Sequence, residues 1–167
     1  MITKKFTYQN LLFFLLLTSI FALLGAYISQ YIFGMQPCQL CFWQRKPFFA
    51  IIILAVLFLM ISSLKNYQKL AIWLAILLLL INAAIAFYHS GVEQKWFAGL
   101  DSCSMPEMQI NNVEDLKLAL EQTKAVRCDQ PQFMFLKLSM ASWNFIYCLL
   151  AASFSYCALR IIKNKND

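Results

Sequence analysis

Four long apolar runs constrain the fold of this chain more than any other feature. They cover approximately residues 11–33, 42–64, 70–89 and 141–162, and each is close to the ~20 residues that a helix needs to cross a bilayer. Hydrophobic residues make up 61% of the 167 residues and charged residues 13%, so a water-soluble surface would not cover them. The sequence therefore predicts an all-α membrane protein, a four-transmembrane-helix bundle that forms a single integral membrane domain over residues 1–167.

The first run predicts a retained span rather than a cleaved signal sequence. It is longer than the apolar part of a signal peptide, and Leu23 and Leu24 stand where a cleavage site needs a small residue. We therefore count it with the other three.

The basic residues indicate the topology. They flank the runs singly, with Arg45 and Lys46 as the discordant pair, and they do not form the basic face that a nucleic acid would need. Those that set the orientation lie near the two termini and between the second and third runs: Lys4, Lys5, Lys65, Lys69, Arg160, Lys163 and Lys165. The positive-inside rule places these three regions in the cytoplasm and two loops, approximately 34–41 and 90–140, outside.

Four of the six cysteines fall in the two external loops, where disulfides survive: Cys38, Cys41, Cys103 and Cys128. Cys148 and Cys157 lie in the fourth run, nine residues apart, so they point to opposite faces of a helix and cannot pair. We expect these two to be small buried hydrophobic residues.

The Cys38-x-x-Cys41 pair lies at the start of the second run. A helix N-terminus and Arg45, four residues after Cys41, both favour a thiolate, so we expect the reactive thiolate at Cys41. Half of a zinc site, an incidental pair of buried thiols and a structural disulfide are the alternatives. The wide separation of Cys103 and Cys128 disfavours zinc, and a Cys-x-x-Cys ring is too easily reduced to be a good structural crosslink.

His89 ends the third run and admits two interpretations. It is either an interfacial polar group or a hydrogen-bond and proton donor to an electron acceptor, with Glu93 one turn later to orient it. Aromatic residues near the cysteine pair either line a pocket or belong to the aromatic belt at the membrane surface: Phe42, Trp43, Phe48 and Phe49. Farther along, Asn112 is expected to cap a short amphipathic helix with Val113, Leu116 and Leu120 on one side, lying on the lipid surface or against the bundle.

The layout resembles the disulfide bond formation protein B (DsbB) family. The resemblance rests on Pro37-Cys38-Gln39-Leu40-Cys41-Phe42-Trp43-Gln44-Arg45, on Tyr88-His89 at the end of the third run, and on a second cysteine pair in the following loop. It implies a thiol:quinone oxidoreductase of the bacterial inner membrane, with the cysteine loops in the periplasm. Such an enzyme assists protein folding by reoxidising a periplasmic thioredoxin-fold oxidase (DsbA-like) and passing the electrons to a membrane quinone, ubiquinone or menaquinone.

The resemblance also gives each thiol a role. Cys103 would form the mixed disulfide with the partner, Cys128 would then engage Cys38, and the released Cys41 would meet the quinone. Arg45 and His89 would complete the quinone site, and no metal is expected. Two departures from the common pattern, Gln44 where an acidic residue often precedes the arginine and the nearby Pro47, bear on the choice of partner.

Two other functions fit parts of the pattern. A vitamin K epoxide reductase-like enzyme is also a four-span thiol enzyme, but its Cys-x-x-Cys lies near the last span. A membrane scaffold or metal-handling protein would hold a soft cation with the four external thiols.

Overall fold

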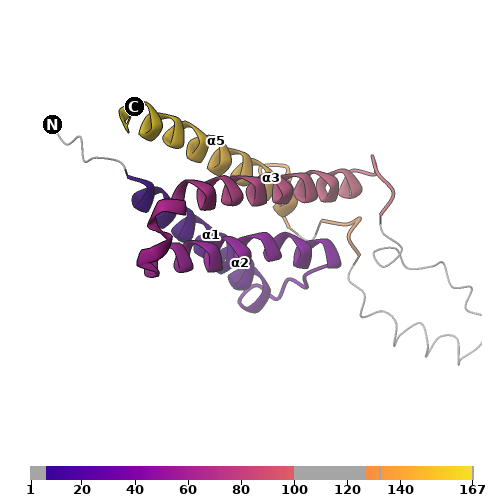
Figure 1. The fold of residues 1–167 in the computed structure, drawn as a ribbon. Coiled ribbons are helices and arrows are strands. Elements are labelled where there is room, and N and C mark those ends of the chain that lie inside the picture. Colours follow the sequence, from indigo (N-terminus) through magenta and orange to yellow (C-terminus); the bar gives the residue numbers. More distant parts are fainter. Residues whose placement is uncertain (1–6, 100–126, 132, 167) are drawn as a thin grey trace, which may run out of the picture.

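The computed structural model describes residues 7–99, 127–131 and 133–166. In these ranges it contains four long helices, α1 (Tyr8–Tyr31), α2 (Gln39–Met60), α3 (Gln68–Glu93) and α5 (Met140–Asn166). Each is long and apolar enough to cross a membrane, and together they form one bundle (Figure 1). The predicted four-helix membrane fold is confirmed.

The chain runs up and down through the bundle. A 3-10 helix, η1 (Ser62–Tyr67), joins α2 to α3 and replaces the expected tight turn. The start of α1, η1 and the end of α5 lie at one end of the bundle, and the start of α2 and the end of α3 lie at the other (Figure 1). We call the latter the cysteine end because Cys38 immediately precedes α2.

Small residues allow α3 and α5 to pack closely. These helices make the most extensive contact in the bundle. The buried face of α3 includes Ala71, Ala75 and Ala83, and α5 contributes Ala151 and Ala152 to the same core. Helices in a bilayer associate through such close packing, because lipid tails already solvate large apolar side chains.

The buried stripe of α3 continues to the cysteine end of the bundle. Leu79, Asn82, Ala86 and His89 follow one another at spacings of three or four residues, and all are buried. The helix runs on to Glu93, past the predicted boundary at residue 89, since no proline interrupts it. His89 therefore faces the interior of the bundle.

Helix α2 begins at Gln39, three residues before the approximate start expected from hydropathy, because polar residues in its first turns mask the helical signal. Pro47 lies inside this helix, as expected for an early start, and it cannot donate a hydrogen bond to the carbonyl of Trp43.

A two-stranded antiparallel hairpin, β1 (Met134–Phe135) and β2 (Leu138–Ser139), precedes α5. Leu136 and Lys137 form its turn with φ angles of 52° and 63°, a left-handed pair typical of a two-residue hairpin turn. The sequence pattern did not predict this hairpin. The amphipathic helix expected from Asn112 lies outside the described residues.

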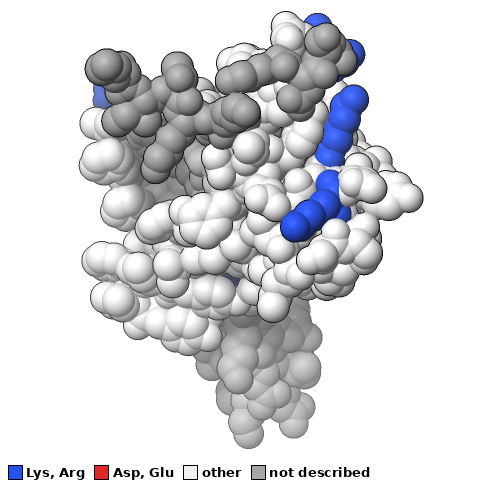
Figure 2. All heavy atoms as spheres, turned by 60° about the vertical axis from the view of Figure 1, so that its left-hand side comes forward, with Lys and Arg blue, Asp and Glu red and all other residues white. Residues whose placement is uncertain are grey.

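The outward surface of the helices is apolar, as a lipid-facing surface must be. Phe13 and Ile53 are 54% and 59% exposed. In the view of Figure 2, most of the visible basic side chains lie along the upper right of an otherwise uncharged surface, and no acidic side chain is visible.

The expectation that both cysteines of α5 are buried is wrong for Cys157. Cys148 is buried, whereas Cys157 is exposed on the outside of the bundle. The reason is the helical period, which turns residues nine positions apart to opposite faces.

Candidate functional site

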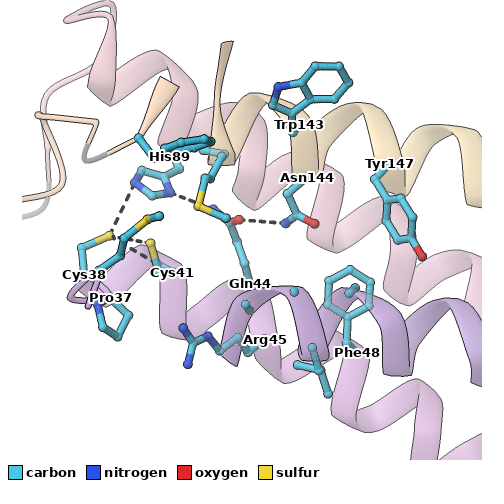
Figure 3. Close-up of a pocket in the computed structure, with 18 of the residues that line it drawn as sticks. Pro37, Cys38, Cys41, Gln44, Arg45, Phe48, His89, Trp143, Asn144 and Tyr147 are labelled. Atoms are coloured by element: carbon cyan, nitrogen blue, oxygen red, sulfur yellow. Dashed lines mark hydrogen bonds between the residues drawn. The ribbon is translucent and has the colours of Figure 1, made fainter. Parts of the chain in front are cut away.

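A cavity of about 510 Å³ opens beside the cysteine end of the bundle. All four helices contribute to its wall, which includes Cys38, Cys41, Arg45, His89 and Tyr147. Figure 3 shows the two cysteines on α2 and His89 facing them from α3. The structure thus brings together four residues that the sequence singled out: Cys38, Cys41, Arg45 and His89.

Cys38 caps the N-terminus of α2. Its backbone is extended, with φ −77° and ψ 173°, and its Sγ accepts a hydrogen bond from the backbone N–H of Cys41 at 3.4 Å. Pro37 precedes it in the cavity wall and Gln39 begins the helix. The sulfur of Cys38, rather than that of Cys41, therefore occupies the capping position at the positive end of the helix dipole.

The two sulfurs lie side by side as free thiols. Their Sγ atoms are 3.1 Å apart, Cys38 is buried and Cys41 is partly buried. The hydrogen bond from Cys41 lowers the pKa of Cys38 to about 4, burial opposes this, and His89 lowers it further. Cys38 is therefore a thiolate at neutral pH, where the sequence predicted a thiolate at Cys41, because the helix cap and His89 act on Cys38.

His89 connects the thiol pair to a polar network that crosses three helices. Its Nε2 lies 3.5 Å from the Sγ of Cys38, and its Nδ1 lies 2.8 Å from the amide nitrogen of Gln44. The amide oxygen of Gln44 accepts a hydrogen bond from Asn144 of α5 at 2.7 Å. The carbonyl oxygen of Asn144 accepts from the thiol of Cys148 at 3.6 Å.

This network determines which nitrogen of His89 carries the proton. Because Asn144 donates to the Gln44 oxygen, the Gln44 amide nitrogen is left to donate to Nδ1. Nε2 of the neutral imidazole then bears the hydrogen and donates toward the Cys38 sulfur. The network thus stabilises negative charge on Cys38 (Figure 3).

Glu93 lies beside the same imidazole, as the sequence suggested. Its Oε1 is 3.7 Å from Nε2 of His89, and the two side chains are 9% and 5% exposed. Its other carboxylate oxygen, Oε2, is buried and has no hydrogen-bond partner among the residues that the structure describes. Glu93 therefore offers an unsatisfied acceptor at the edge of the thiol pair.

Arg45 forms the α1 side of the site. It donates a hydrogen bond to Gln30 at 2.7 Å, and its guanidinium carbon lies 5.1 Å from the centre of the Tyr27 ring and 5.3 Å from that of Phe42. These contacts hold a permanent positive charge in the cavity wall.

The four predicted aromatic residues divide between the two proposed environments. Phe48 is buried and lines the cavity, whereas Phe42, Trp43 and Phe49 are exposed on the outside of the bundle. The cavity wall contains other aromatic residues, among them Trp143.

Cys128 lies close to the thiol pair. It is disulfide-bonded and buried, and it belongs to a small apolar cluster with Cys38, Leu40 and Val92. Cys103, the other thiol expected outside the membrane, lies outside the described residues. The cluster places Cys128 beside Cys38, which itself borders the cavity.

Sequence reasoning did not place Gln44 and Asn144 in one hydrogen-bond network. Asn144 carried a usable signal, because a polar side chain inside an apolar span is costly and commonly functional. Gln44 belongs to the motif that carries the resemblance, but its partners lie 45 and 100 residues away in the chain, so its contacts were not predictable.

Comparison with known proteins yields two matches. Residues 8–158 match the family model described as "Disulfide bond formation protein DsbB". The chain is also similar to the uncharacterized protein RP370 of Rickettsia prowazekii (strain Madrid E), with 32% identity over 151 residues that cover 88% of this chain and 86% of that protein.

Proposed function

The chain belongs to the DsbB family of disulfide bond formation proteins, and from this premise we propose that it is a membrane thiol:quinone oxidoreductase. In this proposal the protein lies in the inner membrane with the cysteine end of the bundle facing the periplasm, and it reoxidises a DsbA-like thioredoxin-fold oxidase. The single observation that carries the proposal is the free Cys38–Cys41 pair in the wall of a cavity lined by all four long helices.

The cavity fits a quinone ring in size and chemistry. A volume of about 510 Å³ lies within the range of small-molecule sites, which combine apolar walls with a few oriented polar groups. Here the polar groups include Arg45, His89 and Asn144, and apolar residues of α1 and α5 line other parts of the wall. A bound quinone would accept two electrons and two protons and leave as the quinol.

The first exchange takes place between loops. A reduced partner attacks the Cys103–Cys128 disulfide, and its two thiols become a disulfide as Cys103 and Cys128 become thiols. The Cys128 thiolate then attacks Cys38 in the oxidised Cys38–Cys41 pair and releases Cys41 as a thiolate. The shared cluster of Cys38 and Cys128 supports this route.

The second exchange returns Cys38. When Cys128 pairs again with Cys103, Cys38 leaves as a thiolate, and its low pKa makes it a good leaving group. Loss of the two electrons from Cys38 and Cys41 then restores their disulfide. Arg45 stabilises the negative charge that develops in the cavity, and His89 is placed to pass a proton.

The test uses the purified full chain in detergent with a reduced thioredoxin-fold oxidase and a quinone. We expect wild-type protein to reduce the quinone as the partner thiols are consumed, and Cys41→Ser to lose on the order of 10³-fold or more of the rate. Cys157→Ser, which changes an outward-facing thiol, should retain full activity. Undiminished turnover in Cys41→Ser would exclude the proposal.

A trapped adduct tests which cysteine meets the partner. With Cys128→Ala, Cys103 is a free thiol that attacks the disulfide of the oxidised partner, and the mixed disulfide that forms has no Cys128 thiol to release it, so it should accumulate. Mass spectrometry of that adduct identifies the natural partner. An impermeant maleimide applied to intact cells and, separately, to opened cells tests the topology, and labelling of Cys38 only in opened cells would contradict it.

A further inference from the structure

Three metal-ligating atoms converge at the thiol pair. The Sγ atoms of Cys38 and Cys41 and an imidazole nitrogen of His89 all lie within 4.8 Å of one another. In a tetrahedral zinc site the bond lengths of ~2.3 Å to sulfur and ~2.0 Å to nitrogen place sulfur about 3.6 Å from nitrogen. The distance of 3.5 Å between Cys38 Sγ and His89 Nε2 matches this edge.

The sulfur pair needs only a small adjustment. Two sulfurs on one tetrahedral zinc are about 3.8 Å apart, and those of Cys38 and Cys41 are 3.1 Å apart. Cys41 is partly buried and borders the cavity, so a side-chain rotation toward open space provides the remaining separation.

Glu93 borders this group and supplies a fourth ligand when its side chain turns toward the sulfurs. Its Oε1 is 3.7 Å from the same imidazole nitrogen but is not among the ligand atoms that lie within 4.8 Å of one another, and its buried Oε2 has no hydrogen-bond partner among the described residues. A buried carboxylate oxygen without a donor is costly, and a cation would satisfy it. Two sulfurs, one imidazole and one carboxylate form a donor set that suits zinc.

The second layer of the site, meaning Gln44 and Asn144 behind the imidazole of His89, is compatible with metal binding. A ligating Nε2 must be unprotonated, so the proton moves to Nδ1, which then donates to Gln44. The polarity described above is that of the metal-free site. Turning the amides of Gln44 and Asn144 by 180° reverses the hydrogen bonds among His89, Gln44 and Asn144, because each amide carries both a donor and an acceptor, and the Cys148 sulfur then accepts from Asn144 instead of donating to it. The network therefore accommodates either polarity.

We propose that the reduced form of this protein binds one thiophilic divalent cation, of the Zn²⁺ class, through Cys38, Cys41, His89 and Glu93, and that the cation blocks reoxidation of the thiol pair. Binding displaces the remaining thiol proton and transfers no electron. Oxidation of the pair to a disulfide removes two ligands, so the site exists only in the reduced state. The cation thus acts as an inhibitor that recognises the redox state.

Binding is measured with Co²⁺ as a spectroscopic probe on the full chain carrying Cys103→Ser and Cys128→Ser, without quinone or protein partner. We expect about one equivalent of Co²⁺ with the absorption of a tetrahedral thiolate site, displaced by Zn²⁺. His89→Ala and Glu93→Gln should weaken binding by about tenfold or more, and Gln44→Leu by about tenfold through the second layer. Cys157→Ser is the matched thiol control and should bind normally.

X-ray absorption on reduced, zinc-loaded wild-type protein keeps the test valid if a variant misfolds. Two sulfur and two nitrogen or oxygen ligands support the proposal. Four sulfur ligands, undiminished binding in Cys38→Ser, or equal binding by oxidised protein overturns it. These measurements of metal binding do not require turnover. They therefore test the metal site even if the protein does not reduce quinone.

Discussion

The cysteine end and the middle of the bundle bury polar groups in different ways. At the cysteine end, His89, Gln44 and Asn144 satisfy one another across three helices. In the middle, the hydroxyl of Ser19 and the amide of Asn82 are buried without hydrogen-bond partners among the described residues, and the surrounding contacts are apolar. The first region specifies the orientation of chemical groups, and the second holds the helices together by packing.

This difference predicts that stability and chemistry respond to separate substitutions. Leu15→Ala removes a fully buried side chain from the middle of the bundle and should lower the free energy of unfolding by about 2–5 kcal/mol. Thermal unfolding in detergent measures this loss. The folded fraction should react with thiol reagents at Cys38 as wild type does.

Phe13→Ala is the matched control for that loss. Phe13 is 54% exposed on the outside of the bundle, where lipid or detergent fills the space left by its ring. A change in stability as large as that of Leu15→Ala would show that the outer surface also carries packing energy, and the comparison of the two regions would fail.

At the cysteine end, His89→Ala should act on reactivity more than on stability. The pKa of Cys38, about 4 in the folded protein, should rise by about one to two units because a charge-assisted hydrogen bond to the thiolate is lost. The measurement is the rate of Cys38 alkylation at several pH values, with the modified peptide identified by mass spectrometry.

The sign of the pH dependence is specific. In wild type, Cys38 is already ionised well above pH 4, so its alkylation rate should be flat between about pH 6 and pH 8. An ordinary thiol would instead gain nearly tenfold per pH unit over this range. A rate that rises steeply in wild-type protein would contradict the capping geometry of Cys38.

Substitutions farther along the network should have smaller effects on the same pKa. Gln44→Leu removes the donor to Nδ1 and leaves Nε2 free to lose its hydrogen, so the pKa of Cys38 should rise by less than in His89→Ala. Asn144→Leu acts one bond farther away and should change it less again. An effect of Asn144→Leu that exceeds that of His89→Ala would rule out the order of the network.

The smallest effect is expected at Cys148. Its thiol contacts Asn144 at 3.6 Å but lies far from the exchanging sulfurs along the network. Cys148→Ala should cost about 1 kcal/mol of stability, from one small cavity and one weak hydrogen bond, and leave Cys38 alkylation unchanged. Cys157→Ala, outside the bundle, should alter neither quantity.

The same contrast explains which features were predictable from the sequence. The four spans follow from hydropathy, because membrane thickness sets their length and lipid exposes apolar side chains on all sides. The far end of α3 was harder to predict, since Ser90 and Glu93 resemble a loop in polarity although nothing breaks the helix. Cys157 was assigned to the interior because composition, unlike helical phase, does not distinguish lipid from core.

The site was predictable only in part. Cys38, Cys41, Arg45 and His89 were identifiable from local spacing and chain position, and they do border one cavity. Which of the two cysteines caps α2 depends on the residue at which the helix starts. Hydropathy does not show that residue, because the first turns of α2 contain polar side chains. Gln44 became part of the site only through contacts between α2, α3 and α5.

Pro47 has a mechanical consequence for the sulfurs. Because it cannot donate to the carbonyl of Trp43, one backbone hydrogen bond is missing between the first two turns of α2 and the remainder of the helix. Joining sulfurs that stand 3.1 Å apart takes a displacement of about 1 Å. A joint at this place lets the short segment tilt by that amount when the sulfurs join, while Phe48, Ile51 and Ala55, which are buried on α2 beyond the proline, stay still.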